Sequence, residues 1–430
     1  MENKNLIKEK LQPVRGTKDI YGAEISAFNH IIDVTKKASF AYGFGELATP
    51  IFEFSEIFER NLGETSDIIS KEVYKFPDRG DNFLTLRPEF TAGVVRAFIS
   101  NGELSQILPQ KFFSFGPIFR YDRPQKGRQR QFHQINFEAI GGAHFLNDVE
   151  IISLAFDILK NLGIADKTDL QINSLGCEKT KENYQNALSI YFSKYQNQLS
   201  EDSKNRLIKN PLRILDSKDK NDIEICQNSP KISDFYEAES EDNFKKILEN
   251  LDKIGIKYQV NSRLVRGLDY YTSTIFEFVT RPIDSDNKGK SLGAQNTVLA
   301  GGRYDKLIAK MGGNDIPAIG FAAGIERLML LIDKKSSVAR PVFVIYVSEN
   351  EQGEAFKIAG RLRKEGVYVE IIYGANFKKQ IKKATAVTAK FVIIIGEEEL
   401  KSGQYSVKNF DKGSEEKIPA DEILKYLQSN

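Results

Sequence analysis

Residues 112–141 read FFSFGPIFRYDRPQKGRQRQFHQINFEAIG, and this stretch decides the fold of the chain. Residues 111–120 and 132–140 are rich in side chains that favour strands, and a loop of eleven residues joins them. In the second strand the side chains alternate with period 2, because successive Cβ atoms point to opposite faces of a sheet. One face carries Gln134, Asn136 and Glu138, and the other carries Ile135, Phe137 and Ala139.

The polar face of that strand has two interpretations: the solvated side of a half-exposed strand, or the floor of a binding site. The connecting loop favours a site, because a single acid, Asp122, stands among a group of cations. These are Arg123, Lys126, Arg128 and Arg130, with Arg120 at the end of the first strand. A polar floor beneath a cationic loop suits an anionic ligand that carries phosphate. No GxxxxGK[ST] loop occurs, nor a GxGxxG between a strand and a helix, so a nucleotide would be held by side chains on a sheet.

A second candidate segment is SRLVRGLDYYTSTIFEF, residues 262–278. Strand-like sequence is expected from 264 to 280, with Tyr270 and Tyr271 packed on opposite faces, before a polar loop over 282–295. Arg266 lies between apolar residues and a glycine, where a buried guanidinium needs a partner. That partner is either Asp269, in a structural ion pair, or a ligand in a cleft.

A third candidate segment combines AGGRYD (300–305) with PAIGFAAGIERL (317–328). Residues 320–332 are expected to form a buried helix that begins with glycine. Arg327 would then lie two helical turns beyond Gly320 on the same side. It either reaches a site or is solvated.

The 430 residues exceed what one hydrophobic core usually organises, and the residue composition and hydrophobic spacing change along the chain. Residues 1–176 form the first part of one domain, and 256–334 return to it. Residues 177–255 are polar with helical spacing and predict a helical insertion with a small core of its own. From 337 to 430 strands alternate with helices, which predicts a small α/β domain with a largely parallel sheet and an edge strand at 405–410.

Composition excludes several classes of protein. Lys and Arg total 61 against 59 Asp and Glu, so the net charge of +2 neither indicates nor excludes a nucleic-acid partner. The first residues lack the apolar stretch of a signal peptide, and no apolar run approaches the ~20 residues that span a bilayer. Two cysteines and three histidines are a poor supply of metal ligands. We therefore expect a cytoplasmic protein with no membrane association and no tightly bound metal.

The four signature segments occur in an order that resembles class II aminoacyl-tRNA synthetases, and RGLDYYTSTIFEF is similar to the histidine-specific motif of histidyl-tRNA synthetases. The segments are TPIFE (49–53), FRYDRP with RQFHQ (119–134), RGLDYY (266–271) and GFAAGIERL (320–328). LRPEFTAGVVRA (86–97), RGTKD (15–19) and NPLRILDSK (210–218) extend the resemblance over nearly the whole chain, and the last resembles the bacterial or organellar type.

The resemblance implies an α+β protein: an antiparallel-sheet catalytic domain with a helical insertion, plus a C-terminal α/β anticodon-binding domain. It implies activation of L-histidine with ATP and Mg²⁺, giving histidyl-adenylate and pyrophosphate, followed by transfer to the 3′ end of histidine tRNA. The segment around Pro50 would build a homodimer interface. Rival assignments are a regulatory paralogue that activates ATP phosphoribosyltransferase, a synthetase-like protein that only binds RNA, and a proline or threonine synthetase, against which RGLDYY argues.

The resemblance also assigns roles to single residues. Arg120 and Arg266 would act at the α-phosphate as catalytic residues, and both would touch histidine. Histidine would further be bound by Glu89, Thr91, Gln134, Glu138, Tyr270 and Tyr271. Glu138 and Tyr271 are implied to hold the imidazole. ATP would be bound by Arg120, Asp122, Arg128, Phe132 and Arg327.

Three positions depart from the family pattern: Phe90 and Asn296 replace a common glycine, and Asp122 replaces a glutamate. In the C-terminal domain, a run of lysines is either a phosphate-binding stripe or a solvated helix face. These are Lys378, Lys379, Lys382 and Lys383.

Overall fold

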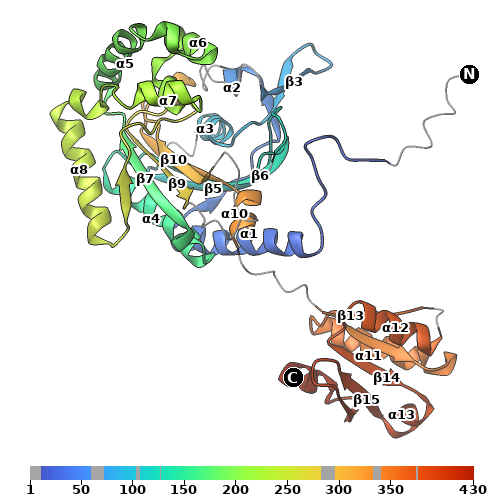
Figure 1. The fold of residues 1–430 in the computed structure, drawn as a ribbon. Coiled ribbons are helices and arrows are strands. Elements are labelled where there is room, and N and C mark those ends of the chain that lie inside the picture. The colour runs from blue at the N-terminus through green and yellow to red at the C-terminus, as the bar shows by residue number, and fades with distance from the viewer. Residues whose placement is uncertain are drawn as a thin grey trace, which may run out of the picture. The chain divides into compact units, whose positions relative to one another are not determined.

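A computed structural model describes residues 11–59, 72–102, 107–125, 127–281, 296–332, 340–373 and 376–430. The chain forms two compact units, Met1–Lys335 and Ser336–Asn430 (Figure 1). Lys126 and the polar loop expected over 282–295 lie outside the described residues. Among the helices that are described, none is both long and apolar enough to cross a membrane.

The first unit is built on an eight-stranded sheet of order β1-β5-β6-β11-β10-β9-β7-β8. Neighbouring strands are antiparallel except at the two edges, where β1 pairs with β5 and β7 with β8 in parallel. The strands are β1 (Gly45–Glu46), β5 (Gln110–Phe119), β6 (Gln131–Ile140), β7 (Thr168–Ser174), β8 (Tyr258–Val260), β9 (Thr274–Thr280), β10 (Thr297–Arg303) and β11 (Ala318–Gly324). The expected α+β class with an antiparallel sheet is confirmed.

The two faces of β6 differ as the alternation predicted. Ile135, Phe137 and Ala139 pack in a core with the helices α1 (Ala23–Ala41) and α4 (Leu146–Asn161), which cover that face of the sheet (Figure 1). On the other face Asn136 and Glu138 are each only 1% exposed. The interpretation of this face as solvated is therefore wrong.

Residues 318–324 form a strand, so the helix expected over 320–332 is wrong in its first part. The helix α10 (Ile325–Leu331) begins only after Gly324. β11 lies between β6 and β10, and a Cβ on Gly301 of β10 would lie 2.2 Å from the Gly320 carbonyl oxygen. Small residues are therefore needed where β10 and β11 pack together. The prediction failed because a central strand lacks the alternation of polar and apolar residues by which strands are recognised in a sequence. The prediction that Arg327 lies two helical turns beyond Gly320 is also wrong, because Gly320 is in β11 and Arg327 is in α10.

The segment before β9 also differs from expectation, because residues 264–273 form neither helix nor strand. The insertion that precedes it is helical, as predicted. It contains α5 (Glu178–Ser193), η4 (Gln196–Gln198), α6 (Glu201–Lys209), η5 (Pro211–Asp216), α7 (Lys220–Cys226), η6 (Ile232–Phe235) and α8 (Ala238–Lys253). The prediction of a separate core is wrong: Tyr184, Leu188 and Phe192 of α5 belong to one cluster with Val94 and Phe98 of α3 (Thr91–Ser100).

A small sheet of order β2-β4-β3 flanks the large one. Its strands are β2 (Phe52–Phe54), β3 (Tyr74–Pro77) and β4 (Phe83–Leu86), with the short helix α2 (Glu56–Glu59) after β2. Their register places six apolar side chains on one face: Phe52, Phe54, Tyr74, Phe76, Leu84 and Leu86. The three phenylalanines of this apolar face are exposed by 38 to 55%.

The second unit has a five-stranded sheet of order β13-β12-β14-β15-β16. It comprises β12 (Val342–Tyr346), η8 (Glu349–Glu351), α11 (Gln352–Lys364), β13 (Val369–Ile371), α12 (Phe377–Ala386), β14 (Phe391–Ile395), α13 (Glu397–Ser402), β15 (Gln404–Asn409), β16 (Ser414–Pro419) and α14 (Ile423–Ser429). Only the pairs β12–β13 and β12–β14 are parallel. The prediction of a largely parallel sheet is therefore wrong. The edge strand expected at 405–410 is the internal strand β15, and the edges of the sheet are β13 and β16, whose short polar sequence gave a weak signal.

Candidate functional site

A cavity of about 1910 Å³ lies over the polar face of the large sheet. All twelve residues to which the resemblance assigned a role line it, whereas Arg123 and Arg130 of the cationic loop are not among its lining. The twelve are Glu89, Thr91, Arg120, Asp122, Arg128, Phe132, Gln134, Glu138, Arg266, Tyr270, Tyr271 and Arg327. Residues from α6, η5 and α7 of the insertion complete the lining. Segments far apart in the sequence thus meet at one site.

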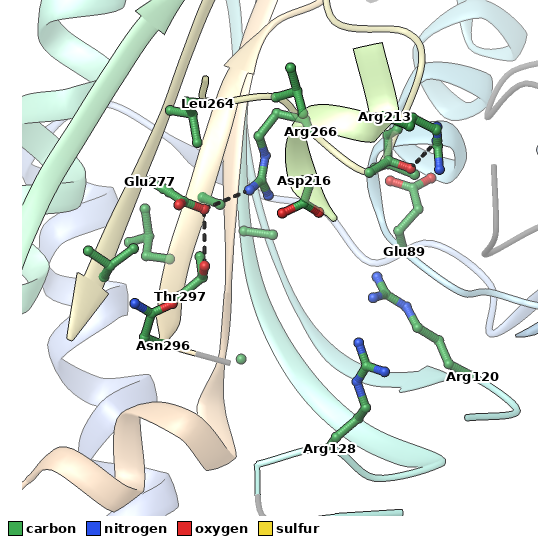
Figure 2. A pocket seen from close by; sticks show the side chains of 18 of the residues that line it. Glu89, Arg120, Arg128, Arg213, Asp216, Leu264, Arg266, Glu277, Asn296 and Thr297 are labelled. Atoms are coloured by element: carbon green, nitrogen blue, oxygen red, sulfur yellow. Dashed lines mark hydrogen bonds and ion pairs between the residues drawn. The ribbon is translucent and has the colours of Figure 1, made fainter. Parts of the chain in front are cut away.

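Four arginines line the cavity and lie close enough to interact electrostatically: Arg120, Arg128, Arg266 and Arg327. Figure 2 shows the first three directed toward a common space, two from the connection between β5 and β6 and one from the segment before β9. Arg120 follows β5, and its Nε donates to the Pro88 carbonyl oxygen at 2.9 Å. Arg327 donates to the carbonyl oxygens of Gly127 and Thr297, each at 2.9 Å.

The electrostatics of this cluster favour a polyanion. Burial, together with the positive charges of Arg120, Arg128 and Arg266, lowers the pKa of Arg327 to about 10. Burial also lowers the pKa of Arg120. Cations gathered in a desolvated place repel one another, so a multiply charged phosphate ligand would relieve the repulsion.

Arg266 is paired with Glu277 of β9, at 3.0 Å between Nη1 and Oε2, and not with Asp269 (Figure 2). Thr297 Oγ1 donates to the same carboxylate oxygen at 3.0 Å. Glu277 was in the quoted segment but had received no role, because nothing in the spacing showed that β9 returns beside Arg266. The ion-pair alternative with Asp269 is wrong.

In the cationic loop, Asp122 forms an ion pair with Arg128, at 2.6 Å between Oδ2 and Nη1. The shorter acid at this position therefore contacts the loop's own arginine. The guanidinium of Arg120 lies 5.4 Å from the centre of the Phe132 ring. Asn296, the third departure from the family pattern, also lines the cavity.

The opposite end of the cavity is centred on the Glu138 carboxylate. It accepts hydrogen bonds from Thr91 Oγ1 at 2.5 Å, from Asn136 Nδ2 at 3.1 Å and from the Tyr304 hydroxyl. Burial raises the pKa of Glu138 to about 7, although these bonds oppose the shift. Gly320 faces it, and a Cβ there would lie 1.7 Å from Glu138 Oε2. The glycine is therefore required by the carboxylate.

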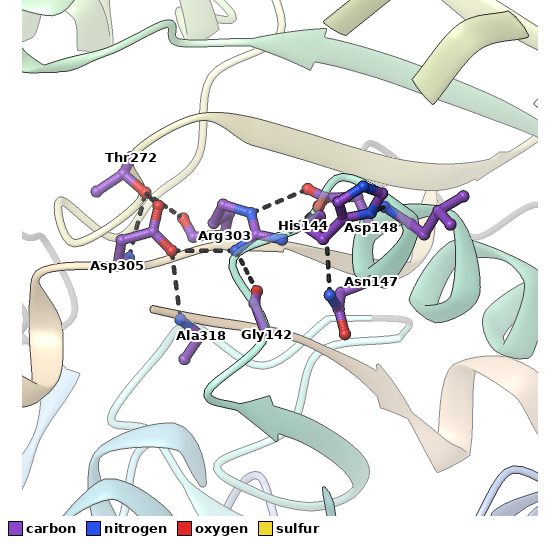
Figure 3. A network of polar contacts seen from close by, with 9 residues as sticks. Gly142, His144, Asn147, Asp148, Thr272, Arg303, Asp305 and Ala318 are labelled. Atoms are coloured by element: carbon purple, nitrogen blue, oxygen red, sulfur yellow. Dashed lines mark hydrogen bonds and ion pairs between the residues drawn. The ribbon is translucent and has the colours of Figure 1, made fainter. Parts of the chain in front are cut away.

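Tyr304 is a second site residue, after Glu277, to which sequence reasoning gave no role. It is 1% exposed, lines the cavity and binds Glu138. Its neighbour Arg303 forms a buried ion pair with Asp148 and donates to the Gly142 carbonyl oxygen at 2.8 Å (Figure 3). The AGGRYD segment was quoted without a role for Tyr304, because a lone tyrosine gives no signal of its partner across the sheet.

Glu89 and Phe90 lie at the start of α3. Both Glu89 oxygens accept backbone N–H bonds, from Thr91 at 2.6 Å and Ala92 at 2.7 Å, so the carboxylate caps the helix. Phe90 is 1% exposed, and the Arg87 guanidinium lies 4.2 Å from its ring centre. The aromatic side chain is thus accommodated under a buried arginine.

Tyr270 and Tyr271 lie in the irregular segment and contact each other, with ring centres 4.8 Å apart. Both are buried and both line the cavity, so the expectation of opposite strand faces is wrong. Burial raises the pKa of both phenols, which keeps them neutral donors at pH 7.

Two lining residues present buried polar atoms that have no hydrogen-bond partner within the described part of the chain. These atoms are Gln134 Oε1, an acceptor, and Arg266 Nε, a donor. Unsatisfied buried groups are rare in folded proteins and call for an explanation. A polar ligand with both a donor and an anionic acceptor would satisfy the two.

Comparisons with known proteins agree with this geometry. The family model for histidyl-tRNA synthetase matches residues 16–328, and the model for an anticodon binding domain matches 341–430. The histidine–tRNA ligase of Wolbachia pipientis subsp. Culex pipiens is 50% identical over 97% of this chain and 99% of its own length. That of Orientia tsutsugamushi (strain Boryong) is 47% identical over 98% and 99%.

Solved structures give the same result. Apo histidyl-tRNA synthetase of S. aureus is similar with a TM-score of 0.80 and 32% identity, over 97% of this chain and 99% of that one. A structure described as an ATP phosphoribosyltransferase regulatory subunit or histidyl-tRNA synthetase, from Bacillus halodurans, has a TM-score of 0.65 at 21% identity over 91% and 99%, and shows the fold alone.

An antiparallel sheet with arginines over its polar face and a separate C-terminal sheet domain define a class II aminoacyl-tRNA synthetase fold. The chain belongs to the histidyl-tRNA synthetase family, whose curated members are histidine–tRNA ligases.

Proposed function

We propose that the cavity activates L-histidine with ATP and then transfers the histidyl group to the 3′ end of histidine tRNA. The convergence of Arg120, Arg128, Arg266 and Arg327 on one end of the cavity is the observation that supports this most directly. The polar end around Glu138 has the character of an amino-acid pocket.

In this proposal the amino acid spans the two ends. Gln134 Oε1 accepts from the α-amino group, with Glu89 and Thr91 beside it. Glu138 accepts from one imidazole nitrogen and Tyr271 satisfies the other, with Tyr270 packed alongside. A neutral imidazole has one donor and one acceptor, so an amino acid without them leaves buried groups unpaired. A site of that kind can discriminate against such analogues by a factor of ~10⁴–10⁵ in kcat/KM.

ATP lies at the cationic end, with its adenine against Phe132 and its phosphates near Arg128 and Arg327. Arg120 and Arg266 act at the α-phosphate. The histidine carboxylate is already ionised at pH 7, so its attack on the α-phosphorus needs no general base. Catalysis then rests on alignment and on fixed positive charge that stabilises the phosphoryl oxygens as pyrophosphate leaves. The 3′-terminal ribose hydroxyl of tRNA attacks the adenylate carbonyl in the second step.

Mg²⁺ fits this site as a partner of ATP. No cluster of three His, Cys, Asp or Glu side chains suited to a metal occurs in the part of the chain that the structure describes. The lining includes the carboxylates of Glu277 and Glu326, which are the hard oxygen ligands that Mg²⁺ prefers. Such an ion would offset phosphate charge while the phosphates supply most of its ligands.

The C-terminal unit is proposed to bind the tRNA anticodon arm. The four lysines of the 378–383 stripe are all exposed on α12. Lysines on one helix face can contact phosphates and position an RNA without reading its sequence. Residues 1–176 and 256–334 would form the catalytic domain, 177–255 its insertion and 337–430 the anticodon domain. Because its charged-tRNA product is consumed in protein synthesis, the location proposed is the cytoplasm.

The active form is proposed to be a homodimer. The apolar face of β2, β4 and β3 exposes three phenylalanines at one place, and exposed patches of this kind mark protein contacts. A second copy is the natural partner, because a two-fold contact uses one face twice. Thr49 and Pro50, which enter this sheet, accept hydrogen bonds from Arg87, next to the Glu89 loop.

Histidine-dependent exchange of pyrophosphate into ATP tests the proposal. Purified protein should exchange with histidine and Mg-ATP in the absence of tRNA, and should not exchange with other amino acids. Folded protein that shows no pyrophosphate exchange would contradict the assignment as an enzyme and favour the regulatory paralogue.

A further inference from the structure

The irregular segment 264–273 carries Arg266, Tyr270 and Tyr271 into the cavity without support from a strand of its own. The sheet holds its two ends and, through Glu277 of β9, the side chain of Arg266. At one end the Leu264 carbonyl oxygen accepts from Asn173 Nδ2 at 3.1 Å. At the other end Thr272 N donates to the Arg303 carbonyl oxygen at 2.8 Å, and its hydroxyl contacts Asp305 (Figure 3).

The middle of the segment is held by the insertion. Arg213 of η5 donates from Nη2 to the Gly267 carbonyl oxygen at 2.7 Å and to Asp269 Oδ1 at 3.1 Å. Asn210 Nδ2 donates to the same Asp269 oxygen at 3.2 Å. The Arg213–Asp269 ion pair is only partly exposed, at 11% and 21% of the two side chains, so solvent screens it less than a surface pair.

A lysine from a second element of the insertion acts on the same segment. Lys181 of α5 donates from Nζ to the carbonyl oxygens of Asp269, at 3.4 Å, and Tyr271, at 3.2 Å. Burial lowers the pKa of Lys181. Backbone carbonyls that lack a strand partner are thus satisfied by charged donors of the insertion.

The insertion fixes Arg213 in turn. Asp222 is fully buried and accepts from the hydroxyls of Ser200, Ser203 and Ser217, at 2.6 to 2.7 Å. Ser217 directly follows η5 and Ser200 caps α6, so the two ends of the segment that bears Arg213 are tied to one carboxylate.

We propose that the insertion is the positioning element of the amino-acid pocket, with Arg213 as the positioning residue and Asp269 as the group it holds. The proposal rests on the proposed function for the identity of the ligand. Arg213 acts through Tyr270 and Tyr271. The side chain of Arg266, in the same segment, is held by Glu277 of β9, and Arg120 and Arg128 are carried by β5 and its loop. Loss of the contact should therefore disturb histidine more than ATP.

The test compares Arg213→Ala, Asp269→Asn and the double variant in pyrophosphate exchange. Lys179→Ala is the matched control, because Lys179 lies on α5 near Lys181 but pairs with Glu237. Each single variant should raise the histidine KM about tenfold and leave the ATP KM within about twofold. The double variant should lose less than the sum of the two single variants, since both remove the Arg213–Asp269 pair, although Arg213 also donates to Gly267 and Asp269 also accepts from Asn210. Fully additive effects, or unchanged histidine KM values, would overturn the proposal.

Amide hydrogen exchange without ligands separates positioning from folding. In Arg213→Ala, peptides from 264–273 should exchange faster while the strands β6 and β11 keep wild-type rates; Arg213→Lys should recover part of the protection. Uniformly faster exchange with a lowered Tm would show a purely structural role. Wild-type protein that exchanges no pyrophosphate would defeat the proposed function, and the hydrogen-exchange result would still decide the positioning role.

Discussion

Glu138 offers a quantitative test of how the pocket is built, through the variant Glu138→Gln. Gln is nearly isosteric, and the hydroxyls of Thr91 and Tyr304 can each donate or accept, so the variant keeps partners for its amide. The change removes only the titration. In the folded protein burial raises the pKa of Glu138 from 4.5 to about 7.

The sign follows from proton linkage. Below pH 4.5 the carboxyl is protonated in both the folded and the unfolded chain, so its titration does not reduce the free energy of unfolding. Between pH 4.5 and about 7 the folded protein keeps a proton that the unfolded chain has released, and stability falls as the pH rises. The whole shift is worth about 3 kcal/mol. The wild type should lose that much relative to Glu138→Gln between pH 4 and pH 8.

Urea unfolding of both proteins across this range measures the effect, because differences at each pH cancel the contributions of all other groups. The exposed Glu415 gives a matched control: Glu415→Gln should track the wild type at every pH. A difference between wild type and Glu138→Gln that does not change from pH 4 to pH 8 would refute the buried, protonated carboxyl.

Four further results are expected. Arg266→His should slow adenylate formation by ~10²–10³ with little change in histidine KM, since its charge acts at the α-phosphate; a lowered Tm with normal turnover would mark it as structural. Deletion of 337–430 should abolish tRNA charging and spare pyrophosphate exchange, and equal loss of both would contradict separate sites. Charge reversal of the lysine stripe, Lys378, Lys379, Lys382 and Lys383, should flatten the salt dependence of tRNA binding, and an unchanged slope would mean a solvated face. Phe54→Lys should give a monomer by light scattering, because it buries a charge in an apolar contact, and a persistent dimer would place the interface elsewhere.

Local patterns in the sequence were sufficient where a residue's environment follows from its neighbours in the chain. The alternation of residues 134–139 predicted both faces of β6, because side chains on a strand change face at every residue. The cationic loop after Arg120 indicated a phosphate ligand from charge alone. The resemblance of four short segments then indicated the family, and all twelve residues it named line the cavity.

Local patterns failed where packing against distant elements sets the conformation. The segment 318–324 has the small residues of a close-packed helix, yet it is a central strand, because β6 and β10 lie on either side of it. Arg266 has an acid three residues away and pairs instead with Glu277, eleven residues away, because the chain turns before β9.

The sequence by itself determined which chemical groups the site contains: arginines for phosphate, a carboxylate and phenols for a polar side chain, and glycines for close approach. Only the tertiary structure decided which of them meet. Tyr304 reaches Glu138 across the sheet, and Arg213 of the insertion reaches Asp269 in the pocket segment. Arg213 and Asp269 are 56 positions apart in the chain, and Tyr304 and Glu138 are 166 positions apart. Such contacts depend on how the strands of the sheet and the insertion pack together, which no local periodicity of the sequence can predict.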